Sequence, residues 1–456
     1  MRIDGTALQK RFIGDRSFYR EVIAISLPII LQQLITTLMG IADNIMVGQI
    51  SSDVLASVTV ANKYFMITQS VMFGITGGIC IFISQYYGAE DHDKVQGLFL
   101  LNMLGALTVA GISTAILLAF PRQLLGIFLT SDHTIAYGLE YLGYVVFSYL
   151  PFAVSLACMT ALRSIGYTKA PLMISIGAVF LNVGLNYALI FGKFGLPRMG
   201  VAGAALATLI ARIVEMLLFA AVISSGREYF TFSTREFRVM DKKLLRQIWS
   251  RALPLLGNEI LWSTGTTSLF WAYSFVHEPF IAALAIVEMS SGVAFVIFGG
   301  LGVSISVMIG KRLGAGLFEE AKANAGRLIV FACGFSLLMT LGMFLLAPAI
   351  PHLFNTSEAI RLMATQLLRT QALFYIVITI NVSCFLIFRA GGDTKSAMAI
   401  DSGFVWFFSL PLAVFLALVV KPPLPLFYLI IQSCELLKMV IAVRYLKRGR
   451  WVVNLT

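Results

Sequence analysis

Residues 22–48 read VIAISLPIILQQLITTLMGIADNIMVG, an apolar run long enough to cross a lipid bilayer as a helix. The run carries Leu27-Pro28, and a later apolar run carries Leu253-Pro254, so that Pro254 follows Pro28 by 226 residues. The same offset relates further matches: Gly88-Ala89 with Gly314-Ala315, Phe128 with Phe354, Thr130-Ser131 with Thr356-Ser357, Arg163 with Arg389, Gly166 with Gly392, and Arg212 with Lys438. A constant offset at so many places indicates that the chain consists of two copies of one unit.

The composition places both copies in a membrane. The chain is 58% hydrophobic and 12% charged, against roughly 25% charged residues in soluble domains. Apolar runs of spanning length lie at about 22–48, 54–85, 95–119, 135–162, 170–192, 200–225, 248–276, 280–310, 322–347, 360–388, 397–420 and 423–446. Such uninterrupted runs exclude the alternating strands of a membrane barrel. We therefore predict an all-α integral membrane protein with twelve transmembrane helices.

The net charge of +11 would be compatible with nucleic-acid binding, but the distribution of the charge argues against it. With the N-terminus placed inside, most Lys and Arg residues fall in the inner loops, which is the positive-inside rule. We predict cytoplasmic termini, no nucleic-acid partner, and a multi-pass monomer in the inner (plasma) membrane. The basic start precedes a long first span and has no cleavage site, so it is interpreted as an uncleaved signal anchor.

Each half contains an even number of predicted spans, six, so both halves enter the membrane in the same orientation. Such parallel repeats are related by an axis along the membrane normal, and their substrate site is expected between them near the midplane. The predicted organisation is a cytoplasmic N-terminal segment 1–21, an N-lobe 22–225, a cytoplasmic linker 226–247, a C-lobe 248–446 and a cytoplasmic tail 447–456. The charged linker would permit the lobes to rock.

Polar residues in the first and fifth spans form the first candidate site. A charge at the bilayer centre costs about 2.5–3.5 kcal/mol, so each one needs a reason. Gln33, Thr36 and Asp43 have the spacing of one helical face. Asn182 and Asn186 are one turn apart at a similar depth. A carboxylate facing two amides predicts a proton or sodium site, and the alternative is a satisfied interhelical hydrogen-bond cluster.

The second half has a different acid. Glu259 is the repeat partner of Gln33 and shares a helical face with Ser263 and Thr266. It is interpreted as part of the substrate site, with a carboxylate held neutral by apolar surroundings as the alternative. The predicted substrate cleft comprises Gln33, Thr36, Glu259, Ser263, Thr266 and Asn381.

Other charges in the spans have weaker interpretations. Lys63 and Glu288 occupy nearly equivalent places in spans two and eight and are a candidate outer gate, unless Lys63 extends its amine to the membrane surface. Two pairs three residues apart are predicted to be structural intrahelical ion pairs: Arg212 with Glu215, and Lys438 with Glu435. Three residues are interpreted as inner-face anchors or as a span boundary: Arg163, Arg389 and Asp401.

Several kinds of chemistry find no support in the sequence. The five cysteines lie in spans without metal-ligand spacing. The histidines are too scattered for a zinc site: His92, His133, His277 and His352. No Walker loop, HExxH motif or catalytic aspartate pair is present, so neither ATP use nor intramembrane catalysis is expected. We predict a transporter without a cofactor.

Four stretches resemble one known family. They are the run from Leu27-Pro28 to Asp43-Asn44-Ile45-Met46-Val47-Gly48, LNVGLNYALIFGKFGLPRMGVAGAALATLIAR at 181–212, RAGGDTK at 389–395, and GRWVVNLT at 449–456. They resemble multidrug and toxic compound extrusion (MATE) transporters over essentially the whole chain. The resemblance implies two lobes flanking a central cleft and secondary active export of cationic or amphipathic compounds in exchange for H⁺ or Na⁺.

The resemblance also implies roles for individual residues. In many members the first-helix acid acts with Asn and Asp on helix five and Thr on helix six, which match Asp43, Asn182, Asn186 and Thr208. This sequence departs from the pattern because Asn186 stands where many members have Asp, which favours a single proton on Asp43, with Na⁺ possible. The helix-seven acid of some bacterial members lies about one turn beyond Glu259. A flippase for a lipid-linked molecule is an alternative, but acids in the spans favour cationic cargo over phosphate.

Overall fold

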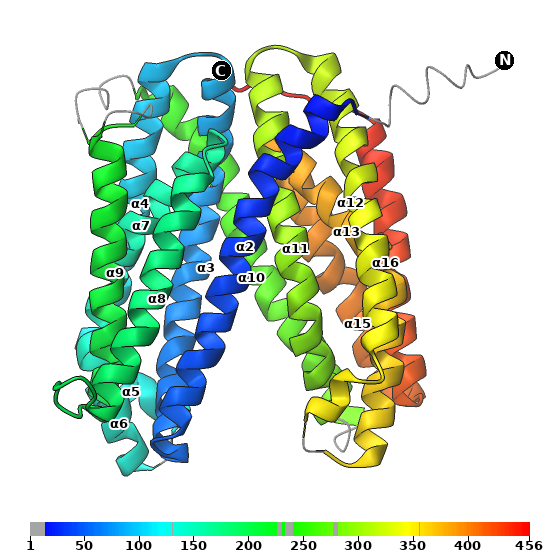
Figure 1. The fold of residues 1–456 in the computed structure, drawn as a ribbon. Helices are drawn as coiled ribbons and strands as arrows, with labels where there is room; N and C mark the ends of the chain where they lie inside the picture. Colours follow the sequence, from blue (N-terminus) through cyan, green and yellow to red (C-terminus); the bar gives the residue numbers. More distant parts are fainter. Residues whose placement is uncertain (1–13, 130, 226–229, 233–239, 277–280, 355) are drawn as a thin grey trace. The chain divides into compact units, whose positions relative to one another are not determined.

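The computed structural model describes residues 14–129, 131–225, 230–232, 240–276, 281–354 and 356–456, and the regular structure of these residues is helical (Figure 1). Eleven of their helices are long and apolar enough to cross a membrane. Helix α10 (Lys242–Val276) has 35 residues but is not among them. Its polar positions, including Asn258, Glu259 and the hydroxyl residues between 263 and 268, lower its hydropathy. The predicted twelve spans therefore correspond to these eleven helices and α10.

The chain forms two compact units, which we call the N-unit (Leu31–Leu256) and the C-unit (Met1–Ile30 with Gly257–Thr456). The N-unit contains α2 (Arg16–Gly48) from Leu31 onward, α3 (Ser52–Gly88), α4 (His92–Ala119), α5 (Pro121–Gly126), α6 (Asp132–Val145), α7 (Tyr149–Ser164), α8 (Lys169–Phe191), α9 (Gly200–Ser224) and the start of α10. The predicted fourth span consists of α6 and α7, joined by a 3₁₀ turn at Val146–Ser148. The short helix α5 was not predicted.

The C-unit contains the rest of α10 together with α11 (Ile281–Gly314), α12 (Phe318–Leu346), a 3₁₀ turn (Ile350–Leu353), α13 (Glu358–Ala390) and α16 (Leu424–Lys447). The predicted eleventh span is irregular. It runs through α14 (Thr394–Met398), π-helical segments at Ala399–Gly403 and Val405–Ser409, α15 (Leu410–Phe415) and a third π segment at Leu416–Val420. Such π segments are uncommon and often occur at functional positions.

The two helices that open the repeats each contribute to both units. The first part of α2, up to Ile30, belongs to the C-unit, where Val22 and Ile29 join a buried core cluster with Met308 of α11. Glu21 forms an ion pair with Arg312, 3.4 Å apart. Buried apolar contacts of this kind are the main source of stability in helical packing. Through them the part of α2 up to Ile30 packs as part of the C-unit.

Helix α10 does the reverse, since its residues up to Leu256 belong to the N-unit. Gly74 and Gly78 of α3 permit a close approach: a Cβ on Gly78 would lie 2.5 Å from the Cα of Ala252. The boundaries between the N-unit and the C-unit thus lie at 30/31 and 256/257, whereas the predicted N-lobe ended at 225 and the predicted C-lobe began at 248. The lobes as bodies that move stay a prediction.

The repeat found in the sequence recurs in backbone conformation. Helices α7 and α13 end in the same turn, with positive φ at Gly166 (81°) and Gly392 (79°). The amide of Gly166 donates to the carbonyl of Arg163 at 2.9 Å, and the amide of Gly392 donates to that of Arg389 at 3.0 Å. Glycine adopts positive φ without a Cβ clash, so both copies retain it.

The start of α2 and the C-terminal tail meet at one end of the C-unit. Phe18 near the start of α2 and Trp451 in the tail share a buried cluster with Leu313 and Ala390, which lie at the ends of α11 and α13. The cytoplasmic side of the termini stays a prediction. Residues 1–13 of the predicted N-terminal segment, residues 226–229 and 233–239 of the predicted linker, and His277 lie outside the described residues.

Candidate functional site

A chain of polar contacts in the N-unit joins four of the predicted site residues. The Nδ2 of Asn186 on α8 donates to Oδ1 of Asp43 on α2 at 2.7 Å and to Oδ1 of Asn182 at 3.0 Å. The Nδ2 of Asn182 reaches the Oγ1 of Thr208 on α9 at 3.5 Å. We call these four residues the Asp43 network. Helical periodicity places Asn182 and Asn186 on one face of α8, so that both can take part.

The network is buried and holds one carboxyl group. Asn182 is 0% and Asn186 2% exposed, while Asp43 is half-buried. The Oδ1 of Asn186 is buried without a hydrogen-bond partner. Burial of an unpaired polar atom costs about 1–3 kcal/mol. Arg212 lies close enough to attract the Asp43 carboxylate. The Asp43 network therefore combines one ionisable group with one unused hydrogen-bond acceptor.

A second polar chain in the N-unit was not predicted. Gln32, 5% exposed, accepts a hydrogen bond from Nη2 of Arg163 at 2.6 Å and contacts the Oγ of Ser175 through its own Nε2. The Ser175 hydroxyl continues to Oε1 of Glu215 at 3.3 Å, and Glu215 is paired with Arg212 at 2.9 Å. We call these five residues the Gln32 network.

The Gln32 network corrects one interpretation and confirms another. Arg163 was interpreted as an anchor at the inner face, but its guanidinium donates to a buried glutamine and its Nε is itself buried without a partner. The predicted intrahelical pair of Arg212 with Glu215 is confirmed. Arg212 also lies over the ring of Phe152, 4.6 Å from its centroid, a cation–π contact. Spacing along one helix predicted the Arg212 pair but could not predict contacts between helices.

The first-span residues of the predicted cleft lie apart from these contacts. Gln33 is half-buried and Thr36 exposed. The hydroxyl of Thr36 donates to the carbonyl of Gln32 at 2.9 Å, a bond within its own helix. Gln32, the neighbour that helical-face reasoning passed over, makes the interhelical contacts instead. The signal that could have identified Gln32 is its amide repeat partner, Asn258.

In the C-unit, Glu259 faces a cation. Its Oε1 lies 3.9 Å from Nη1 of Arg389, and both side chains are partly buried. Ser263 is exposed, and the hydroxyl of Thr266 bonds to helix carbonyls, at 3.0 Å to Trp262. Glu259 thus forms a long ion pair with Arg389 and is not an isolated carboxyl group in apolar surroundings. The assignment of these residues to a substrate cleft stays a prediction.

Asn381, the remaining predicted cleft residue, belongs to a cluster of charges. Its Nδ2 donates to Oε2 of Glu435 on α16 at 2.7 Å. The Nζ of Lys438 lies 4.0 Å from Glu435, at the limit of an ion pair, and 2.8 Å from Oδ1 of Asp401. The main partner of Lys438 is therefore Asp401, which the sequence had suggested was only a boundary residue. Its position near the start of the eleventh span gave no sign of this partner, because Asp401 and Lys438 lie on different segments.

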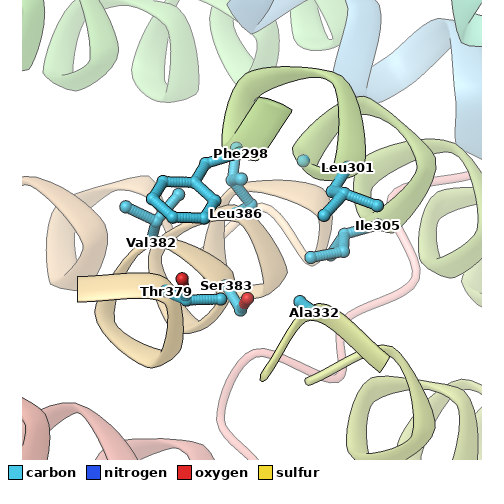
Figure 2. Close-up of a pocket in the computed structure, with 9 residues that line it drawn as sticks. Phe298, Leu301, Ile305, Ala332, Thr379, Val382, Ser383 and Leu386 are labelled. Carbon is cyan, nitrogen blue, oxygen red and sulfur yellow. The ribbon is translucent and has the colours of Figure 1, made fainter. Parts of the chain in front are cut away.

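Two further features lie elsewhere. Lys63 on α3 and Glu288 on α11 are exposed and belong to different units, so their proposed gate stays a prediction. The C-unit also contains a small pocket between α11, α12 and α13 (Figure 2). Its wall is mainly apolar and includes Phe298 and Leu386, with the hydroxyl groups of Thr379 and Ser383 on one side. None of the predicted site residues lines it.

Comparisons with known proteins place this geometry in context. A family model described as MatE matches residues 28–188 and 254–419, one range in each repeat. The multidrug resistance protein PmpM of Pseudomonas aeruginosa is 27% identical over 413 residues, covering 90% of this chain and 86% of PmpM. A probable multidrug resistance protein NorM of Thermotoga maritima is 26% identical over 396 residues, covering 86% of this chain and 84% of NorM.

Solved structures agree on the fold. A crystal structure of a MATE protein in complex with MaL6 superposes with a TM-score of 0.87 at 18% identity, covering 98% of both chains. An outward-facing multidrug resistance MATE family transporter superposes with a TM-score of 0.86 at 18% identity, covering 99% of this chain and 100% of that one. The predicted all-helical, multi-span fold is thereby confirmed.

Proposed function

The chain belongs to the MATE family of multidrug efflux transporters, and from this premise we propose that it exports cationic or amphipathic compounds in exchange for protons. The observation that carries the proposal is the bond from Asn186 to Asp43, a lone carboxyl group in a buried amide network. Members of this family are transporters and not enzymes. We also propose that the protein acts as a monomer in the plasma membrane.

The hydrogen-bonding capacity of Asp43 supports proton coupling. An ionised carboxylate only accepts hydrogen bonds, whereas a protonated carboxyl group also donates one. Ionised Asp43 accepts from the Nδ2 of Asn186, as described, and leaves the Oδ1 of Asn186 without a donor. Protonated Asp43 can supply that donor. Proton binding thus favours a different arrangement of the two side chains, which is what a two-state element requires.

Sodium is the competing coupling ion. It would take oxygen ligands, and the network offers the Asp43 carboxylate with the amide oxygens of Asn182 and Asn186. The Oδ1 of Asn182 already accepts a hydrogen bond from Asn186. A sodium ion at that oxygen would have to share it with the Nδ2 donor of Asn186, whereas a proton on Asp43 needs no oxygen of Asn182. We therefore favour H⁺.

The preference for cationic cargo rests on Glu259. At 3.9 Å from Arg389, its ion pair is loose, so part of its negative charge is left for another cation. Attraction between charges is stronger in partly buried surroundings than in water. A cation that has lost its hydration shell would be held there more firmly than a neutral compound of the same shape. Ser263 and Thr266, further along the same helix, would supply polar contacts on its face.

The coupling ion can be identified in lipid vesicles that contain the purified protein and the fluorescent cation ethidium. No nucleotide is added, and a pH gradient or a sodium gradient is imposed separately. We expect uphill ethidium transport with the pH gradient alone. Transport that needs sodium would replace H⁺ by Na⁺ in the proposal. Transport that appears only when ATP is added, while both gradients are clamped, would refute secondary transport altogether.

A further inference from the structure

The C-unit contains a charge cluster at the positions that the Gln32 network occupies in the N-unit. Asn258, Asp401 and Lys438 are the repeat partners of Gln32, Ser175 and Arg212, each 226 residues further along. The Nδ2 of Asn258 donates to Oδ2 of Asp401 at 3.2 Å, and the Nζ of Lys438 donates to Oδ1 of Asp401 at 2.8 Å. Both copies thus retain an amide and a buried cation at equivalent sites.

The two copies differ in their balance of charge. In the N-unit, the carboxylate of Glu215 has Arg212 as its ion-pair partner at 2.9 Å, and Arg163 adds a second cation to the network. In the C-unit, Asp401 and Glu435 share one ammonium group, that of Lys438. Lys438 is 8% exposed, Asp401 18% and Glu435 21%. The cluster would therefore carry an excess negative charge in poorly hydrated surroundings, which is costly.

A second observation indicates that the cluster is incompletely satisfied. Asn381 donates from its Nδ2 to Oε2 of Glu435 at 2.7 Å, and also to the Glu435 backbone carbonyl at 3.0 Å. The Oδ1 of the same amide is buried without a partner, and Asn381 is 4% exposed. The Oδ1 of Asn381 is therefore a buried acceptor without a donor beside Glu435, as the Oδ1 of Asn186 is beside Asp43. A proton on the cluster would supply a donor and remove the excess charge together.

Other titratable groups face the cluster from the neighbouring helices. Glu259 of α10 interacts electrostatically with Asp401 and is itself held by Arg389 of α13. Cys434 of α16 interacts with Glu435. Arg389 and Glu259 together add no net charge, although their pair is loose, and the thiol adds no charge while it stays protonated. The excess charge therefore remains on Asp401 and Glu435.

We propose that Glu435 is a second proton-binding site of this transporter, a proposal that rests on the proton coupling proposed above. Glu435 is the acid of choice because Asp401 lies much nearer to Lys438, 2.8 Å against 4.0 Å, and also accepts from Asn258. A sodium ion is disfavoured because the ammonium of Lys438 already occupies the place between the two carboxylates. The step is simple: one proton from water adds to a Glu435 carboxylate oxygen, and no bond within the protein breaks.

Proton counting tests the proposal. Purified protein in weakly buffered detergent solution is mixed with saturating ethidium, and a pH-indicator dye measures the protons released per protein. Glu435→Gln should release one proton fewer than wild-type protein, and Glu435→Asp should restore the wild-type count. Glu358→Gln, the same change at a glutamate that is 72% exposed, is the matched control and should release as many protons as wild-type protein. Equal release from Glu435→Gln and wild-type protein would overturn the second site.

The Asp43→Asn variant separates this proposal from the first one and does not depend on the folding of Glu435→Gln. It should release fewer protons than wild-type protein but not none, because it retains Glu435. No release from Asp43→Asn would overturn the second site and leave Asp43 as the single proton carrier. Release equal to the wild-type count would instead overturn the role of Asp43 and, together with one proton fewer from Glu435→Gln, would leave Glu435 as the proton carrier.

Discussion

Replacing Asp43 by asparagine should abolish uphill export while leaving the fold intact. The change keeps the size of the side chain and its ability to accept from Asn186, and it removes the titrating carboxyl group. Transport against a gradient needs a group that binds the coupling ion on one side and releases it on the other. The amide of the Asp43→Asn variant could do neither with a proton, so we expect only downhill movement of ethidium in vesicles.

The contacts of Asp43 set the expected change in stability. The charge-assisted bond from Asn186, 2.7 Å long, is worth about 1.5–3 kcal/mol, and its neutral replacement about 1 kcal/mol. Against that loss, the new amide supplies a donor beside the unpartnered Oδ1 of Asn186, whose burial costs about 1–3 kcal/mol. The two effects have opposite signs and similar size. The free energy of unfolding should therefore change by no more than about 1 kcal/mol.

The assay compares thermal unfolding in detergent with uphill export per folded molecule in vesicles. The matched control is Asp53→Asn, the same change at a carboxylate whose side chain is 56% exposed, which should leave both quantities unchanged. A much lower melting temperature for Asp43→Asn, with export per folded molecule preserved, would show that the Asp43 network is purely structural. Preserved uphill export at wild-type stability would refute the coupling role equally.

Three other outcomes follow from single contacts. Gln32→Leu should lower the free energy of unfolding by about 3 kcal/mol, because it leaves the buried guanidinium of Arg163 without its acceptor. Gln33→Leu, at the half-buried neighbour, should lower it by less than about 1 kcal/mol, and thermal melts of both variants check this. Glu259→Gln should weaken binding of a cationic dye more than that of a neutral analogue, and equal losses in a fluorescence titration would point to packing instead. The backbone amide of Phe18 holds the pKa of Asp15 below its usual value, so its contribution to stability should be present above about pH 4 and be lost on further acidification; an Asp15→Asn variant should lack that dependence.

Much of the Asp43 network could be anticipated from residue spacing. Asn182 and Asn186 are one turn apart, and helix geometry obliges them to share a face. Asp43 was selected as the acid on a polar face of the first span and Thr208 by resemblance to the family, and the structure brings both into contact with those amides. Whether the contact couples ion movement to export is a question that neither spacing nor geometry answers, and the Asp43→Asn experiment addresses it.

The residues that spacing missed are those whose partners lie on other helices. Gln32 stands beside Gln33, and the helical face that contains Asp43 includes Gln33 but not Gln32, which makes the interhelical contacts. Asp401 lies at the start of an irregular span, where its position gave no sign of a partner, but the π-helical segment Ala399–Gly403 carries it to Lys438. A pairing between α16 and a residue 37 positions away cannot be read from either segment alone.

The order of residues is enough to identify a doubled, helical membrane protein, because apolar runs of spanning length and a constant repeat offset can be read from it directly. In hydrocarbon the backbone polar groups can bond only to each other, so such runs form helices whatever their neighbours are. Which buried polar groups meet depends on the packing of the helices. A buried charge or amide must find its partner on a neighbouring helix, and that neighbour depends on how the helices rotate and pack. The pairing of Gln32 with Arg163, and that of Lys438 with Asp401, therefore came from the fold.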